Sequence, residues 1–142
     1  KKEIIHNIDD LAPAKTLFAT NTSSISITEL SDSTRRASNF FGMHFFNPAV
    51  HMKLVEVVKG EHTKDSVVEI GMSLALKMGK HPVRINKDTP GFIVNRVQAP
   101  SGVLLGCILD NKIATPEEID ALLKNVGLPM GPFETMDLKL EF

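Results

Sequence analysis

The chain has 142 residues, a length that suits about one ordinary domain with a core of its own. Its 16 lysine and arginine residues against 17 aspartate and glutamate residues give a formal net charge of -1, which leaves no basic excess to hold a nucleic acid backbone. At 42% hydrophobic and 23% charged residues the composition is globular, and no apolar run approaches the roughly 20 residues that span a bilayer. We therefore expect neither a nucleic acid partner nor a membrane span.

The first half of the chain predicts alternating helices and strands. Apolar residues at helical spacing indicate a helix that ends before Pro13, and short apolar runs rich in strand formers indicate strands. This alternation is typical of an α/β layer with parallel strands. The predicted elements are a helix over 4–11, a strand over 16–20, a helical turn over 26–30, strands over 40–46 and 51–59, a helix over 64–78 that Gly79 closes, and a strand over 81–86.

After Asp88 the pattern becomes entirely helical. Thr89 as N-cap and Pro90 at the first helical position predict a long helix that continues to Leu109, with a kink near Pro100. The segment Thr115-Pro116-Glu117-Glu118 is a capping box, and it predicts a helix that stops at Gly127. We therefore place a domain boundary near residue 87, which gives domains over 1–87 and 88–142.

Both ends of the chain lack the usual signals of a helix end. The first residues, KKEIIHNID, indicate a helix with no cap before it, and the last segment has no closing glycine or polar tail. We expect the chain to be part of a larger protein.

His44 and Glu56 are the first candidate pair for chemistry. If the strands that flank NPAVHM form an antiparallel hairpin centred near Ala49 and Val50, residues 44 and 56 face each other across the ladder, about 5 Å apart. The carboxylate would then fix the imidazole tautomer and stabilise the cation that forms when the ring takes a proton, as in a general base with its orienting acid. The alternative is a structural histidine bonded to an acid in the core.

Two further polar groups are candidates for ligand contact. Ser23 lies in NTSS, which directly follows a buried strand, and open α/β sheets bind ligands at the carboxyl ends of their strands. Turn residues that bond their own backbone are the alternative, and no general base in the sequence neighbourhood marks Ser23 as a nucleophile. Asn95 lies about one turn into the helix predicted from Thr89, where an amide is unfavourable unless its side chain is engaged.

No metal site is predicted. His6, His51, His62 and His81 share no ligand spacing with one another or with Cys107. The single cysteine also excludes an internal disulfide and suits a reducing compartment. Four phenylalanines, Phe40, Phe41, Phe45 and Phe46, are expected in the core because aromatic residues of strands usually pack there.

Several long motifs, in order, resemble the L-3-hydroxyacyl-CoA dehydrogenases: NTSSISITEL, FFGMHFFNPAVHMKLVEVV, GKHPVRINKDTPGFIVNRV, ATPEEID and GLPMGPFE. The resemblance covers nearly the whole chain. It implies an α/β fold in which the C-terminal half of a Rossmann-like, NAD-binding domain over 1–87 precedes the start of an all-α domain over 88–142. The cytoplasm, or the mitochondrial matrix in a eukaryote, is the expected location.

The resemblance also implies roles for individual residues. It makes His44 and Glu56 the catalytic pair, Ser23 a contact of both substrate and nicotinamide, Asn95 a substrate contact, and Asn47 and Lys1 cofactor contacts. The implied reaction is the reversible oxidation of an L-3-hydroxyacyl-CoA to a 3-ketoacyl-CoA in fatty-acid β-oxidation. A homodimer through the helical domain is also implied, and the apolar run over 103–109 suits a partner face.

Two alternatives remain open at the level of sequence. The chain could belong to a multifunctional hydratase/dehydrogenase protein, or to a non-catalytic homologue of the crystallin kind. No G-x-G-x-x-G segment, which holds the pyrophosphate in this fold, occurs among the 142 residues. We therefore expect this polypeptide alone to lack dehydrogenase activity.

Overall fold

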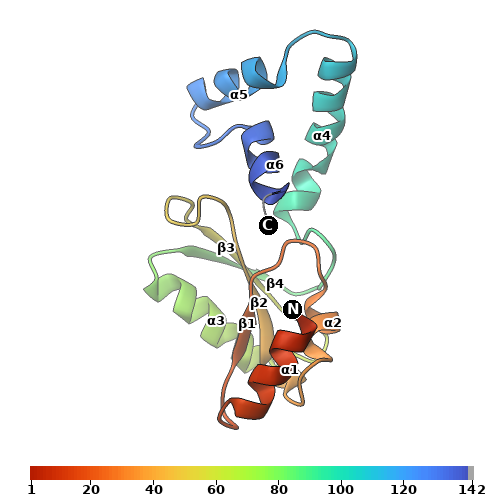
Figure 1. Ribbon diagram of the computed structural model, residues 1–142. Helices are drawn as coiled ribbons and strands as arrows, with labels where there is room; N and C mark the ends of the chain where they lie inside the picture. The colour runs from red at the N-terminus through yellow and green to blue at the C-terminus, as the bar shows by residue number, and fades with distance from the viewer. Residues whose placement is uncertain (141–142) are drawn as a thin grey trace. The chain divides into compact units, whose positions relative to one another are not determined.

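The structure is a computed structural model that describes residues 1–140, and it divides into two compact units, Lys1–Arg96 and Val97–Phe142. The first unit is built on a four-stranded sheet in the order β1-β2-β3-β4 (Figure 1). The strands are β1 (Phe18–Thr20), β2 (Phe40–Phe45), β3 (Leu54–Val58) and β4 (His81–Ile85). The four predicted strands are thus confirmed.

The strand directions correct one prediction and confirm another. β1 pairs with β2 and β3 with β4 in parallel, but β2 and β3 are antiparallel, so the expectation of parallel strands holds for two of the three strand pairs and is wrong for the third. The connection over residues 46–53 explains the difference, since a parallel crossover needs roughly a dozen residues or more and a hairpin needs far fewer. The antiparallel hairpin that the candidate pair required is therefore present.

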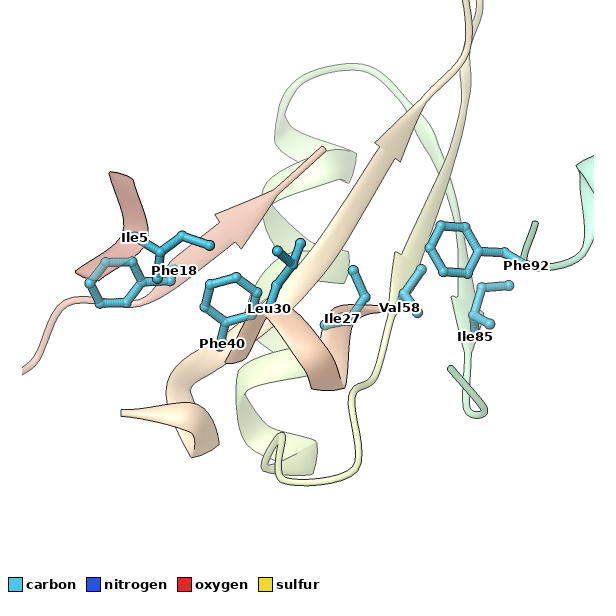
Figure 2. Packing of buried hydrophobic residues seen from close by; sticks show 8 residues of the cluster. All are labelled: Ile5, Phe18, Ile27, Leu30, Phe40, Val58, Ile85 and Phe92. Carbon is cyan, nitrogen blue, oxygen red and sulfur yellow. The ribbon is translucent and has the colours of Figure 1, made fainter. Parts of the chain in front are cut away.

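Helices cover both faces of this sheet, with α1 (Lys2–Leu11) and α3 (Asp65–Lys77) on opposite sides in Figure 1. Alternate residues along β2 and β3 point to opposite faces and enter separate buried clusters. The α1 face, which also carries α2 (Ile27–Ser31), contains the cluster drawn in Figure 2, whereas α3 covers the other cluster. The first cluster comprises Ile5, Phe18, Ile27, Leu30, Phe40, Val58, Ile85 and Phe92, and the second Phe41, Met43, Val55, Val57, Val67, Val68 and Ala75.

A glycine in β2 lets α2 approach the sheet closely. A Cβ on Gly42 would lie only 2.7 Å from Cδ1 of Ile27, a separation that packed carbon atoms do not reach. The absence of a side chain at Gly42 therefore sets how near α2, and the loop before it, lie to the sheet. A short 3₁₀ helix, η1 (Ala37–Asn39), leads from this region into β2.

The described residues of the second unit form helices joined by short loops, without a strand. Its elements are α4 (Val94–Asp110), which begins in the first unit, α5 (Pro116–Asn125) and α6 (Pro132–Leu140). The predicted capping box is confirmed, because Thr115 Oγ1 accepts from the Glu118 N–H at 3.3 Å and Glu118 Oε2 accepts from the Thr115 N–H at 2.8 Å. None of the helices among the described residues has the length and apolar character needed to cross a membrane.

The predicted start of the long helix at Thr89 and Pro90 is wrong. Gly91 and Phe92 have φ values of 79° and 47°, and α4 begins only at Val94. Left-handed backbone cannot continue a right-handed helix, so residues 90–93 form a turn before α4. Pro100 lies inside α4 as expected, and the kink there stays a prediction.

A buried carboxylate ties the end of α1 to the segment before η1. Asp9, only 2% exposed, accepts hydrogen bonds from the Thr34 hydroxyl at 2.7 Å, the Arg35 N–H at 3.0 Å and Nε of Arg36 at 2.7 Å. The Arg35 backbone N–H, the Thr34 hydroxyl and the two arginine side chains hold the pKa of Asp9 well below its ordinary value, against the opposing effect of burial.

We expect the first unit to lose stability in acid through Asp9. A carboxyl group whose pKa is lower in the folded chain stabilises the fold above its unfolded pKa of about 3.9, and this contribution is lost as the pH falls toward the folded pKa. Thermal unfolding followed by circular dichroism should show a midpoint that falls as the pH is lowered from about 5 to about 2, and Asp9→Asn should flatten that dependence. Asp10→Asn, at the exposed neighbouring carboxylate, is the control. A wild-type dependence equal to that of Asp9→Asn would contradict this assignment.

Candidate active site

The site begins with two side chains that face each other across the central hairpin. The register pairs His44 of β2 with Glu56 of β3, and Nδ1 of His44 lies 2.6 Å from Oε2 of Glu56. His44 is 4% exposed and Glu56 is 1% exposed, so water does not weaken this interaction. The predicted pairing of an imidazole with a carboxylate is therefore confirmed.

The second oxygen of Glu56 is also fully engaged. Oε1 accepts from the backbone N–H groups of Ile93 and Val94, each at 3.0 Å. These N–H groups lie at the start of α4, where a helix leaves its first donors unpaired and carries a partial positive charge. A buried carboxylate is costly unless such donors satisfy it, so the turn before α4 is part of what keeps Glu56 beside His44.

The other ring nitrogen of His44 faces a hydroxyl. Nε2 lies 3.2 Å from Oγ of Ser23, in the loop that follows β1. With the carboxylate on Nδ1, the ring proton is expected there, which leaves the Nε2 lone pair free to accept from a hydroxyl. Both interpretations of the NTSS segment therefore apply: Ser23 faces His44, whereas Thr22 Oγ1 accepts from the Ile25 N–H at 3.1 Å, as a turn residue does.

Asn21 holds this loop beside β2, a role that sequence reasoning missed. Its Oδ1 accepts from the Phe45 N–H at 3.2 Å, and its carbonyl accepts from Nζ of Lys1 at 3.0 Å. The available signal was its position immediately after a buried strand, where an amide can bridge to the next strand. Lys1, predicted as a cofactor contact, is thereby placed at the carboxyl end of β1.

Two aromatic rings flank the imidazole. The Phe46 ring centroid lies 4.6 Å from that of His44, and Phe92 approaches edge-on at 5.5 Å. Phe46 is only partly buried, so the expectation that it belongs to the core is wrong, while Phe40 and Phe41 are core residues as expected. The missed signal was the spacing of two residues between His44 and Phe46, which in the predicted strand over 40–46 places both side chains on one face.

The remaining candidates take no part in the hydrogen bonds that join Glu56, His44 and Ser23. Asn47 is exposed, just beyond the end of β2. Asn95 is half-buried and is the second residue of α4, next to Val94, so its predicted place about one turn into the helix is wrong. The late start of α4 is the reason, since the turn over 90–93 shifts Asn95 into the first helical turn.

The joined residues can perform general base chemistry. A hydroxyl that reached the position of the Ser23 Oγ hydrogen bond could give its proton to Nε2, and the resulting imidazolium would lie against the Glu56 carboxylate. The ring cannot easily turn, because a charged hydrogen bond and two aromatic neighbours hold it. The geometry is therefore that of an oriented base, with a serine donor at the same point.

Two family models match the chain in succession. Residues 1–89 match the model described as 3-hydroxyacyl-CoA dehydrogenase, NAD binding domain, and residues 91–139 match that described as 3-hydroxyacyl-CoA dehydrogenase, C-terminal domain. Fold and site thus define a dinucleotide-binding α/β domain that continues into a helical domain. The chain belongs to the 3-hydroxyacyl-CoA dehydrogenase family.

Individual proteins agree with this assignment. The chain is 45% identical over 138 residues to the mitochondrial hydroxyacyl-coenzyme A dehydrogenase of Sus scrofa, covering 96% of this chain and 44% of that protein. It is 48% identical over 139 residues to the 3-hydroxyadipyl-CoA dehydrogenase of Escherichia coli (strain K12), covering 97% of this chain and 29% of that protein. The crystal structure of (S)-3-hydroxybutyryl-CoA dehydrogenase from Ralstonia eutropha matches with a TM-score of 0.76 at 42% identity, covering 92% of this chain and 46% of that one. The chain thus spans less than half the length of each.

We expect Glu56→Gln to change the tautomer of His44. The amide oxygen of glutamine cannot serve Nδ1 and the two backbone N–H groups as a carboxylate does, so the preference for a proton on Nδ1 should weaken. Nitrogen-15 NMR of the imidazole at a pH where it is neutral should show mainly the Nδ1–H form in the wild type and a mixture in the variant. His62, an exposed histidine whose Nε2 lies 3.9 Å from Asp32 Oδ1, should keep the same spectrum in both proteins. An unchanged His44 tautomer in Glu56→Gln would contradict the orienting role.

Proposed function

We propose that the protein containing this chain reversibly oxidises an L-3-hydroxyacyl-CoA to the 3-ketoacyl-CoA with NAD, as part of fatty-acid β-oxidation. The observation that carries the proposal is the orientation of His44, with Nδ1 on a buried carboxylate and Nε2 on a serine hydroxyl. The activities for which the Sus scrofa and Ralstonia eutropha relatives are named support the substrate class.

The residues present fit the nicotinamide end of the cofactor. Ser23, Asn47 and Lys1 lie at or just after the carboxyl ends of β1 and β2, or bond to the loop there, and they offer hydroxyl, amide and ammonium donors. The match of residues 1–89 to an NAD binding domain supports the same cofactor. When bound, NAD would accept the hydride that leaves C3 of the substrate.

The chain's own groups would handle the proton and the substrate oxygen. His44 Nε2 takes the proton of the 3-hydroxyl group, and Glu56 stabilises the imidazolium that results. Ser23 and Asn95 donate to the substrate oxygen, so charge that develops there meets donors already in place, an effect commonly worth several kcal/mol. In the reverse direction the same imidazolium returns the proton.

Domain roles and location belong to the same proposal. We assign residues 1–87 to the NAD-binding domain and residues 88–142 to the helical domain that serves substrate binding and dimerisation. The cytoplasm, or the mitochondrial matrix in a eukaryote, is the proposed location, supported by a mitochondrial and a bacterial relative.

His44→Gln tests the function. In a polypeptide that carries this chain together with a glycine-rich nucleotide-binding half, the variant should lower kcat about 10²- to 10⁴-fold, since glutamine cannot accept the proton as a base. NADH absorbance with acetoacetyl-CoA measures the reaction, and His62→Gln, at an exposed histidine, is the matched control. Wild-type kcat in His44→Gln would contradict the role of His44 as the base, and a wild-type protein without activity would favour the alternative of a non-catalytic, crystallin-like protein.

The multifunctional alternative rests on the differing lengths of the relatives. The chain covers 44% of the Sus scrofa protein but only 29% of the Escherichia coli one, so relatives of this chain carry different amounts of additional sequence. Measuring the mass of the natural protein, together with enoyl-CoA hydration activity, distinguishes a single-activity dehydrogenase from a hydratase/dehydrogenase.

A homodimer through α4 is the last element of the proposal. Val103 and Leu104 on α4 are 69% and 66% exposed, whereas Leu105, Ile108 and Leu109 are half-buried. Exposed aliphatic residues on one helix favour a partner face.

We expect Leu104→Glu to shift the protein from dimer to monomer in sedimentation equilibrium, because a charge would be buried without a partner. Gln98→Glu, which adds the same charge elsewhere on α4, should leave the dimer intact. A monomeric wild type, or a dimer unchanged by Leu104→Glu, would exclude this interface.

A further inference from the structure

Asp88 has an unusual set of partners for a residue in a connecting loop. It lies after β4, and its Oδ2 accepts from the Ser26 hydroxyl at 2.6 Å, the Thr28 N–H at 2.8 Å and the Thr28 hydroxyl at 2.8 Å. Ser26 is also the N-cap residue of α2, where its side chain accepts from the Glu29 N–H. One carboxylate oxygen thus joins the loop after β4 to the start of α2, more than fifty residues earlier in the sequence.

The charge of Asp88 is held in a partly buried place. Burial raises the pKa of this carboxyl group, but the hydrogen bonds from Ser26 and Thr28 outweigh burial and keep the pKa below its ordinary value. Within the described residues its second oxygen, Oδ1, is buried and has no hydrogen-bond partner. Leaving this acceptor without a partner costs free energy, which the three hydrogen bonds to Oδ2 offset.

The loop that Asp88 anchors carries strained backbone. Phe92 has a φ of 47°, a conformation that a residue with a bulky side chain rarely adopts, and Gly91 beside it has a φ of 79°. Such a conformation costs free energy and persists only when surrounding contacts determine it. Here contacts act at both ends, because Asp88 is bound to α2 and the N–H groups of Ile93 and Val94 are bound to Glu56.

The same loop also packs against the imidazole of His44. Phe92 is 3% exposed and packs in the cluster of Figure 2 with Ile27, Val58 and Ile85, while its ring meets His44 edge-on. Ile27 is the first residue of α2, directly after the serine that Asp88 binds. A shift of the loop relative to α2 would therefore move two groups together: the Phe92 ring that packs against His44, and the two backbone N–H groups that donate to Glu56.

We propose that Asp88 is a positioning residue of the reaction: it fixes the loop 88–93 against α2 and so holds Phe92 on His44 and two backbone donors on Glu56. This inference rests on the proposed function. Asp88 touches neither the imidazole nor Glu56 through any of these hydrogen bonds, and it acts through the loop alone.

The test compares Asp88→Ala, Asp88→Asn and Ser26→Ala in the dehydrogenase that contains the full nucleotide-binding domain. Asp88→Ala should lower kcat about 10- to 100-fold, the scale on which small displacements of reacting groups act, with a much smaller change in KM for the cofactor. Asp88→Asn keeps an acceptor oxygen and should restore part of kcat, and Ser26→Ala, which removes one donor, should have an intermediate effect. Asp65→Asn, which weakens surface ion pairs with Lys59 and Arg84, is the matched control with wild-type kcat.

Two further measurements separate positioning from stability. The acid limb of the kcat/KM pH profile reports the protonation of the catalytic base in the free enzyme, and this limb should shift in Asp88→Ala. Nitrogen-15 NMR of the same variant should show a smaller fraction of His44 with its proton on Nδ1. A folded Asp88→Ala protein with wild-type kcat, pH profile and tautomer would overturn the proposal, even if its melting temperature had fallen. If Asp88→Ala does not fold, Asp88→Asn and Ser26→Ala decide by the same measurements.

The result is also separable from the proposed function. Loss of activity in His44→Gln together with wild-type behaviour of all Asp88 and Ser26 variants would overturn the positioning role alone. A wild-type protein with no NADH signal would overturn the proposed function, and the tautomer of His44 in Asp88→Ala would then still report whether the loop orients the ring.

Discussion

The site depends on one buried negative charge. Glu56 lies in the middle of β3, 1% exposed, at a position where an ionised side chain is tolerated only if its oxygens are satisfied. His44 engages one oxygen and the first backbone donors of α4 engage the other. Three parts of the first unit, namely β2, β3 and the turn before α4, are therefore fixed relative to one another by a single carboxylate.

A second carboxylate extends this arrangement to the other side of the site. Asp88 binds the start of α2, and α2 packs directly on β2 because Gly42 has no side chain to keep Ile27 away. The loop that carries Ser23 lies between β1 and α2, so α2 and β2 together determine where the serine hydroxyl meets His44. The imidazole of His44 thus bonds to a carboxylate, faces a hydroxyl and packs between aromatic rings, and different segments of the chain supply these groups.

Sequence patterns predicted most of the elements because each depends on local rules. Pro13 ends α1, the capping box starts α5, and the glycine at position 79 follows α3, with the positive φ of 73° that a helix end favours. The pairing of His44 with Glu56 was also predictable, since strand residues at equal distances from a hairpin centre must face each other. The start of α4 was not, because Thr89 and Pro90 satisfy the local rules for a helix start and only contacts with β3 and α2 oppose them.

The sequence by itself determined the order of the elements, the face on which each strand residue lies, and the family to which the motifs belong. Periodicity and local steric preferences act over a few residues, so they can be read from the chain. Only the tertiary structure decided that Glu56 accepts from the N–H groups of Ile93 and Val94, that Asp88 binds Ser26 and Thr28, and that the ring of Phe92 packs against His44. Those contacts join residues tens of positions apart, and hydrogen bonding between distant segments leaves no periodic trace in the sequence.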